Sequence, residues 1–198
     1  MKKGVIFIIA IVVIAVLILI GSLGMKIMDS AEETTGNQNS NNISNTTNNY
    51  SYNGATIKYG EGWQQEYVGI GEQKYKALCE KDGDIIIVCL QVLDISDGIS
   101  DYSLNSKRQE LYDEIIALET ATYSSQGITI NKQTNEFKEL SNNLYYAYYE
   151  VYNNSYARSY TILNSANDTG ASFLVISDNP LTDLEDTNIN EMLKTIEF

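Results

Sequence analysis

Residues 144–163 read LYYAYYEVYNNSYARSYTIL and contain seven of the 15 tyrosines of the chain. Aromatic residues are enriched in β-strands, whereas Asn153 and Asn154 in the middle are residues that favour turns. The stretch therefore predicts two antiparallel strands, 144–152 and 155–163, joined by a hairpin. This hairpin makes an antiparallel sheet the organising feature of the fold.

The predicted hairpin has two different faces. If Asn153 and Asn154 are the two turn residues, one face is a core face that includes Tyr149, Val151 and Tyr160. The other face is an amphipathic surface of a kind that binds partners. Its predicted partner-binding residues are Tyr146, Tyr148, Tyr152, Ser159 and Thr161. The alternative is that tyrosine simply suits strands and that this face lies partly under a helix.

Further strands and two helices are predicted around this hairpin. The predicted strands are 55–59, 65–70, 74–80, 85–93, 128–134 and 171–177, and the predicted helices are 103–122 and 182–195. Asp82-Gly83 is a strong hairpin dipeptide between two of these strands. In the first helix, Leu104, Leu111, Ile115 and Leu118 share the expected buried face. Residues 52–198 are therefore expected to form one α+β domain, an antiparallel sheet covered by helices.

Two strings near the ends of this domain resemble one family. Residues 55–63, ATIKYGEGW, resemble the opening strand and Trp-containing turn of PsbP-like and Mog1-like domains, and residues 188–198, NINEMLKTIEF, resemble their terminal helix and final aromatic end. Gly60 stands where a proline is common in the family. The resemblance implies an α/β/α sandwich around an antiparallel sheet. It implies little chemistry, because the family includes photosystem assembly subunits, a nuclear GTPase-binding protein and surface lipoproteins.

The composition excludes several functions. The 198 residues contain no histidine, which rules out Ser-His-Asp catalysis and His-based metal sites. Thirteen basic against 26 acidic residues give a net charge of −13, and the basic residues are scattered, so no nucleic-acid partner is expected. We predict no catalytic residues, no cofactor and no metal site.

The N-terminus is predicted to cross a membrane. No charge occurs between Lys3 and Lys26, and residues 4–25 are long enough to span a bilayer as a helix. The lysines before the span place the N-terminus inside and the C-terminal bulk outside, as a single-pass cytoplasmic-membrane protein. One alternative is a cleaved signal peptide. Another is prepilin-like processing after Gly4, although Ile9 stands where pilins have an acidic residue.

A polar segment separates this span from the domain. Residues 26–51 are rich in Asn, Ser and Thr and are expected to form a disordered linker, because they cannot bury enough apolar surface to offset the entropy of ordering. Sequons for glycosylation occur at Asn42, Asn45, Asn49, Asn153 and Asn167. Chance is the alternative explanation, because such a composition produces these triplets freely.

Cys79 and Cys89 are the only cysteines. A two-residue turn at Asp82-Gly83 pairs Cys79 with Ile86 and sends Cys89 to the opposite face, which forbids a bridge. A one-residue bulge would instead allow a disulfide. The default expectation is two small buried thiols, with a disulfide in an exported domain as the alternative.

The acidic segment 94–101 clusters oxygen ligands as a calcium site would need, but its spacing does not fit an EF-hand loop. We expect a turn and a helix cap there instead.

These observations predict a non-enzymatic, membrane-tethered, extracytoplasmic domain that binds or scaffolds another component of the cell envelope, either a protein or a polymer. The alternative is a pilin-like or surface-assembly subunit.

Overall fold

The computed structural model describes residues 48–70, 73–94, 104–125, 127–153 and 155–198. Ten strands and two helices occur in these ranges. Their bounds are β1 Asn48–Tyr52, β2 Ala55–Tyr59, β3 Trp63–Ile70, β4 Gln73–Glu80, β5 Ile86–Asp94, α2 Leu104–Ser125, β6 Ile130–Gln133, β7 Lys138–Ser141, β8 Leu144–Asn153, β9 Ser155–Asn164, β10 Thr169–Ser177 and α3 Asp183–Leu193. The predicted α+β class is confirmed.

The central feature is an eight-stranded sheet with the order β3-β4-β5-β10-β9-β8-β6, in which β7 also pairs with β8. All of the pairings are antiparallel. Strand β10 lies in the middle and is buried along nearly its whole length, because it is paired on both edges and covered on both faces. The large core that this produces is the rigid base on which the site is built.

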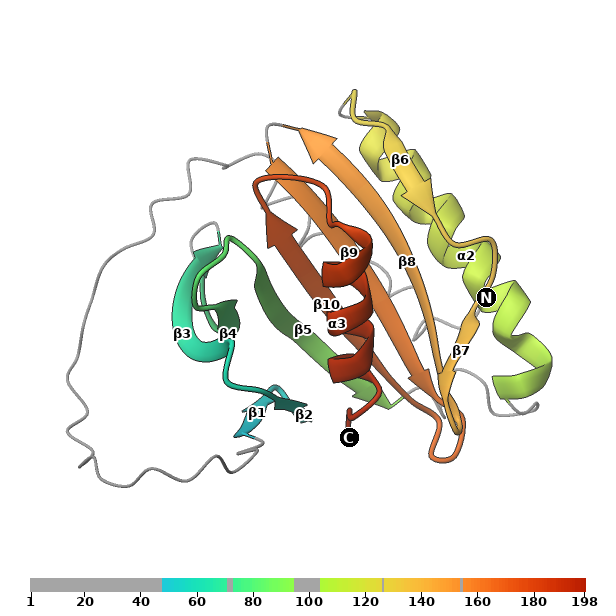
Figure 1. Cartoon of the computed structure of the whole chain (residues 1–198). Helices are drawn as coiled ribbons and strands as arrows, with labels where there is room; N and C mark the ends of the chain where they lie inside the picture. The colour runs from blue at the N-terminus through green and yellow to red at the C-terminus, as the bar shows by residue number, and fades with distance from the viewer. Residues whose placement is uncertain (1–47, 71–72, 95–103, 126, 154) are drawn as a thin grey trace, which may run out of the picture.

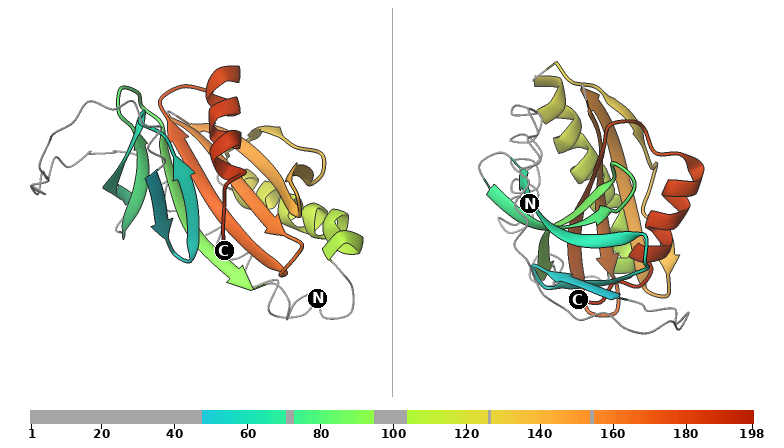
Figure 2. Two further views of the ribbon diagram at one scale, coloured as in Figure 1. Left: turned by 60° about the horizontal axis from the view of Figure 1, so that its bottom comes forward. Right: turned by 60° about the vertical axis from the view of Figure 1, so that its left-hand side comes forward.

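The two helices lie on opposite faces of the sheet (Figures 1 and 2). Ile189, Met192 and Leu193 of α3 join one core cluster together with Tyr160 and Phe173. On the other face, α2 packs through Tyr112 and Tyr123 against residues of β8 and β9. The arrangement has three layers, α/β/α, as the family resemblance implies.

The strands β1 and β2 form a separate two-stranded sheet. Tyr50 of β1 is fully buried, and its hydroxyl donates to Lys76 O at 2.7 Å and accepts from Cys89 N at 3.3 Å. The prediction of a linker that continues to residue 51 is therefore wrong for residues 48–51. Burial of Tyr50 and the pairing with β2 outweigh the polar composition of this short segment.

The β4–β5 hairpin has the predicted register. Cys79 pairs with Ile86, and Glu80 N donates to Ile85 O at 2.9 Å. Cys79 and Cys89 are both free and buried, and they belong to different core clusters on opposite faces of the sheet. The geometry agrees with two buried thiols and argues against the alternative of a disulfide.

The β8–β9 hairpin has a different register from the predicted one. Asn153 pairs with Ser155, and Tyr152 pairs with Tyr156, so every pair is shifted by one residue. Because side chains alternate between faces, a slip of one residue changes which residues share a face. The predicted grouping of the tyrosines with Ser159 and Thr161 is wrong for this reason.

The buried side of α2 also differs from the predicted one. Leu118 is 37% exposed, whereas Tyr112, Glu119 and Tyr123 are buried. The buried stripe is rotated by one position, about 100° around the helix axis. Leu111 and Ile115 of the predicted face still pack against the core at the edge of this stripe, while Tyr112 and Tyr123 form its buried centre.

The predicted membrane span at 4–25, most of the linker and the acidic segment at 95–101 lie outside the described residues. Among the residues that are described, no helix is both long enough and apolar enough to cross a membrane. Membrane tethering stays a prediction.

Candidate functional site

Arg158 is the centre of the most extensive polar network in the described part of the chain. It lies in the middle of β9 between Tyr156 and Tyr160, and it is only 2% exposed. Its Nε donates to the Tyr156 hydroxyl at 2.8 Å, and its Nη1 donates to the Tyr160 hydroxyl at 2.7 Å. Two carboxylates balance its charge. A buried arginine needs this many partners, because an unpaired buried charge is very unfavourable.

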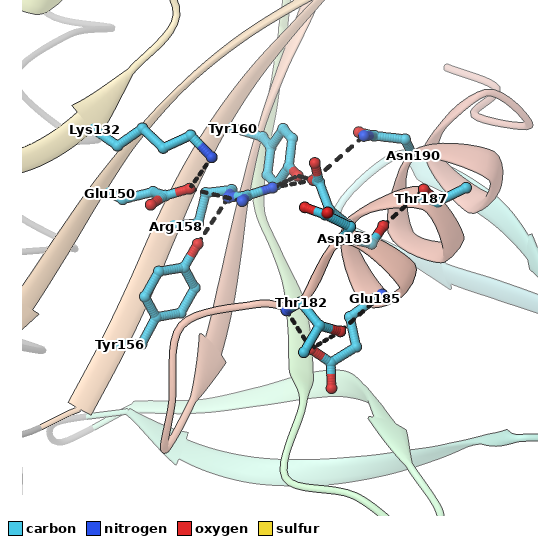
Figure 3. A network of polar contacts seen from close by, with 11 residues as sticks. Lys132, Glu150, Tyr156, Arg158, Tyr160, Thr182, Asp183, Glu185, Thr187 and Asn190 are labelled. Atoms are coloured by element: carbon cyan, nitrogen blue, oxygen red, sulfur yellow. Dashed lines mark hydrogen bonds and ion pairs between the residues drawn. The ribbon is translucent and has the colours of Figure 1, made fainter.

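The two carboxylates come from different elements, and Figure 3 shows Glu150 beside Arg158. Glu150 is directly opposite Arg158 on β8 and reaches its Nη2 at 2.6 Å. Asp186, in the first turn of α3, pairs with Nη1 from the other side. Lys132 of β6 lies 3.6 Å from Glu150, and Asn190 donates to Asp186 at 3.3 Å. The network thereby links β6, β8 and β9 to α3.

The start of α3 is fixed independently of this network. Thr182 is the N-cap, its side chain accepts from Glu185 N at 3.3 Å, and the Glu185 carboxylate accepts from Thr182 N at 2.6 Å. This reciprocal capping box satisfies two backbone donors at the helix terminus. It also sets where the first turn begins, and so where Asp186 meets Arg158.

Burial and contacts shift the protonation equilibria of the network. Burial alone would lower the pKa of Arg158, but its contacts with Tyr160, Tyr156 and Asp186 raise it above the ordinary value. Burial raises the pKa of Tyr160 and of Tyr156 above that of a free tyrosine. The arginine therefore stays charged and both tyrosines stay protonated near neutral pH. These three side chains therefore have a structural role and do not take part in proton transfer near neutral pH.

Three of the five predicted partner-binding residues lie together beside this network. Tyr146, Tyr148 and Tyr152 point to the α3 side of β8, and we call them the tyrosine strip. Tyr146 and Tyr148 are half-buried, and Tyr152 is 49% exposed. Figure 1 shows α3 in front of β9 and β10, with β8 beside it. The strip therefore borders the helix and is not sealed under it.

Two rings of the strip, those of Tyr146 and Tyr148, are held in place. The Tyr146 and Tyr148 rings are nearly parallel, at 12°, with centroids 6.4 Å apart. The guanidinium of Arg158 lies 4.4 Å from the Tyr148 ring centroid, and Lys132 Nζ lies 5.6 Å from the same centroid. These cation–π contacts order the aromatic surface before any ligand binds.

The other two predicted residues, Ser159 and Thr161, face α2. Ser159 is buried, directly opposite Tyr149 on the neighbouring strand β8. Tyr149 also contacts Glu119 of α2, a buried carboxyl group that the sequence did not single out. Its spacing of seven from Tyr112 and four from Tyr123 is the signal that could have identified it.

The described residues offer little to a metal ion, since they contain no group of three or more Cys, Asp or Glu side chains that could hold one. The thiols are also unreactive, because burial raises the pKa of Cys79 to about 11 and that of Cys89 to about 12. The arrangement presents a rigid aromatic surface, and the charged groups beneath it, Arg158, Glu150 and Asp186, are already paired with one another.

The sequons are distributed over several regions. Asn49 and Asn167 are exposed, in β1 and in the turn before β10, and Asn153 ends β8. Asn42 and Asn45 lie outside the described residues. Glycosylation stays a prediction at all five positions.

No family model matches the chain, and no curated protein matches it. Two solved structures are similar over most of its length. A mutant of protein Mog1 matches with 12% identity and a TM-score of 0.36, over 76% of this chain and 95% of its own. The Ran-binding protein Mog1p of Saccharomyces cerevisiae matches with 12% identity and a TM-score of 0.34, over 77% and 96%. Both are Mog1 structures, the family that residues 55–63 and 188–198 resemble, and at this identity and TM-score the similarity carries no conclusion about family or function.

Proposed function

We propose that this protein is a membrane-tethered, extracytoplasmic binding module whose tyrosine strip receives a protein partner in the cell envelope. The observation that carries the proposal is the strip itself: the ordered rings of Tyr146 and Tyr148 and the exposed Tyr152, at the border of α3. Tyrosine is enriched at protein interfaces because one ring offers both a large apolar face and a hydroxyl.

Preorganisation favours a binding role. The network of Arg158 with Glu150 and Asp186 fixes the base of the strip, so these rings lose little conformational freedom when a partner arrives. The same pairing leaves Arg158 without spare capacity for an anionic substrate. A protein surface, which supplies both apolar contacts and hydrogen-bonding groups, fits the strip better than a small charged ligand.

The tether is supported by the sequence. Residues 4–25 carry no charge, and Lys2 and Lys3 precede them, which favours an N-terminus inside and a domain outside. The polar segment that follows would give the domain reach from the bilayer surface. The acidic net charge of the chain disfavours direct contact between the domain and anionic lipids.

Site-specific photocrosslinking in native membranes tests the binding surface. A benzoylphenylalanine in place of Tyr152 is expected to give a discrete protein adduct. The matched control is the same replacement at Tyr67, which is 71% exposed and lies on β3 at the far edge of the sheet. Equal adducts at both positions, or none at Tyr152, would overturn the proposal.

A second substitution makes this test quantitative. Tyr146→Ala in the crosslinking chain is expected to reduce the Tyr152 adduct about tenfold, as removal of a central interface ring does. Leu184→Ala removes an exposed apolar side chain from the outer side of α3 and is expected to leave the adduct unchanged.

The mass of the intact protein from native membranes, before and after deglycosylation, tests the tether. A chain that begins at Met1 or Lys2 supports it. A start at Val5 supports the pilin-like alternative, and a start near Met25 indicates a secreted domain.

A further inference from the structure

Glu119 lies in the interface between α2 and the sheet. It is 1% exposed, and on the same side of α2 it is flanked by Tyr112 and Tyr123, which are also buried. An apolar residue is expected at such a position, because burial of a carboxylate is costly. The chain instead places a deeply buried acid without an ion-pair partner under its longest described helix.

The groups around Glu119 do not neutralise a charge. The Tyr149 hydroxyl contacts the Glu119 carboxyl group, but neither carboxyl oxygen has full hydrogen-bond geometry in the described structure, and the same holds for the Ser159 hydroxyl from β9. The titratable groups that face it are Tyr123 of α2 and Tyr149 of β8, whose hydroxyls lie 3.4 Å apart. The ion pairs of the described residues all involve other carboxylates.

We propose that Glu119 makes the docking of α2 on the sheet depend on pH, so that the helix is held while the carboxyl group is protonated and loosens when it ionises. The charged form can regain hydration only if the helix moves away from Tyr149 and Ser159. When α2 is docked, Tyr123 and the protonated Glu119 are buried together against the sheet. The device is independent of the tyrosine strip, which lies on the opposite face of the sheet.

The direction of the effect follows from proton linkage. Burial raises the pKa of Glu119 from 4.5 to about 7, and the Tyr149 hydroxyl offsets this only in part. The docked state therefore binds more protons than the open state between these two values. Stability of the docked helix is highest below about pH 4.5 and falls as the pH rises to about 7.

Hydrogen exchange of the full chain in detergent micelles, at about pH 5.5 and about pH 8.5, tests this inference. After correction for intrinsic exchange rates, the opening constant of peptides from α2 is compared between the wild type and Glu119→Gln. The opening constant of the wild type, divided by that of the variant, is expected to rise about 30-fold between these pH values. This factor follows by proton linkage from a Glu119 pKa of 4.5 in the open state and about 7 in the docked state.

The amide introduced by Glu119→Gln matches the size of the carboxyl group but does not ionise. Glu110→Gln, which removes an exposed carboxylate of the same helix, is the matched control and should follow the wild type. Glu119→Met provides a second non-ionising variant should the amide perturb folding. An opening constant of the wild type that does not change with pH, or that changes equally in both non-ionising variants, would overturn the inference.

Discussion

Arg158 shows how a single buried residue determines which parts of the surface are free to bind. Its charge is matched by Glu150 from one side and Asp186 from the other, and two neighbouring tyrosine hydroxyls accept hydrogen bonds from its Nε and Nη1. The net contribution of such a network to stability is small when it is complete, but breaking it is strongly unfavourable. The network is therefore best tested by removing one member.

Arg158→Met is expected to lower the free energy of unfolding by about 3–5 kcal/mol, because it leaves Asp186 without a counter-charge and leaves Glu150 with only the exposed Lys132, in a largely buried site. Urea unfolding measures the change. Lys132→Gln removes only the exposed end of the network and is expected to change stability by less than about 1 kcal/mol. A loss under about 1 kcal/mol for Arg158→Met would mean that the carboxylates are hydrated in the native state.

The two thiols provide another test at this scale. Because burial raises the pKa of Cys79 to about 11 and that of Cys89 to about 12, few thiolates are present near neutral pH and alkylation of the folded protein should be slow. In denaturant without a reductant, mass spectrometry should find both cysteines alkylated. Alkylation that requires prior reduction would show the disulfide instead.

At the scale of elements, α3 joins the two parts of the site. Its capping box sets the helix start, its first turn supplies Asp186, and its buried side packs on the sheet through Ile189 and Leu193. The sequence signals for this helix are local and strong: a Thr182–Glu185 pair after the only proline. The predicted helix over 182–195 accordingly agrees closely with the structure.

Thr182→Ala is expected to destabilise the domain by about 1 kcal/mol, because the N-terminus of α3 loses its side-chain acceptor. Thr187→Ala is the control, since Thr187 lies within the helix and only bonds back to Asp183 O at 2.7 Å. Thermal or urea unfolding distinguishes the two. Equal effects of both substitutions would contradict the capping role.

The hairpins β4–β5 and β8–β9 show where local signals are sufficient and where they are not. Asp82-Gly83 has strong turn preferences, and the predicted pairing of Cys79 with Ile86 is confirmed. Asn153-Asn154 has weaker turn preferences, and the observed register of β8 and β9 differs by one residue from the predicted register. Both strands keep the same propensity in either register, so packing against α2 and α3 decides between them.

For the whole molecule, the two ends of the described chain close the fold together. Thr56 of β2 and Glu197 exchange two backbone hydrogen bonds of 2.9 Å, and Lys58 N donates to Thr195 Oγ1 at 2.8 Å. Ile196 is buried in the same core cluster as Ile57. The segment after α3 thus secures the small β1–β2 sheet to the main body.

Removal of residues 196–198 is expected to lower the free energy of unfolding by about 3 kcal/mol, because it exposes the site of a buried isoleucine and breaks this bridge. Glu197→Ala, which removes only an exposed ion pair with Lys58, should change stability by less than about 1 kcal/mol. A truncated chain as stable as the wild type would show that the terminal segment does not contribute to the core.

The sequence by itself determined the α+β class, the positions of most strands and both helices, and the Cys79 register, because each of these depends on short-range alternation, propensity or turn chemistry. Only the tertiary structure decided which β9 residues share a face with Tyr146, Tyr148 and Tyr152, the buried side of α2, the inclusion of β1 in the fold, and the pairing of Arg158 with Glu150 and Asp186. Each of these depends on contacts between residues far apart in the chain or on a register that a one-residue slip reverses. Local patterns do not contain that information, since the same strands and helices can be packed in more than one way.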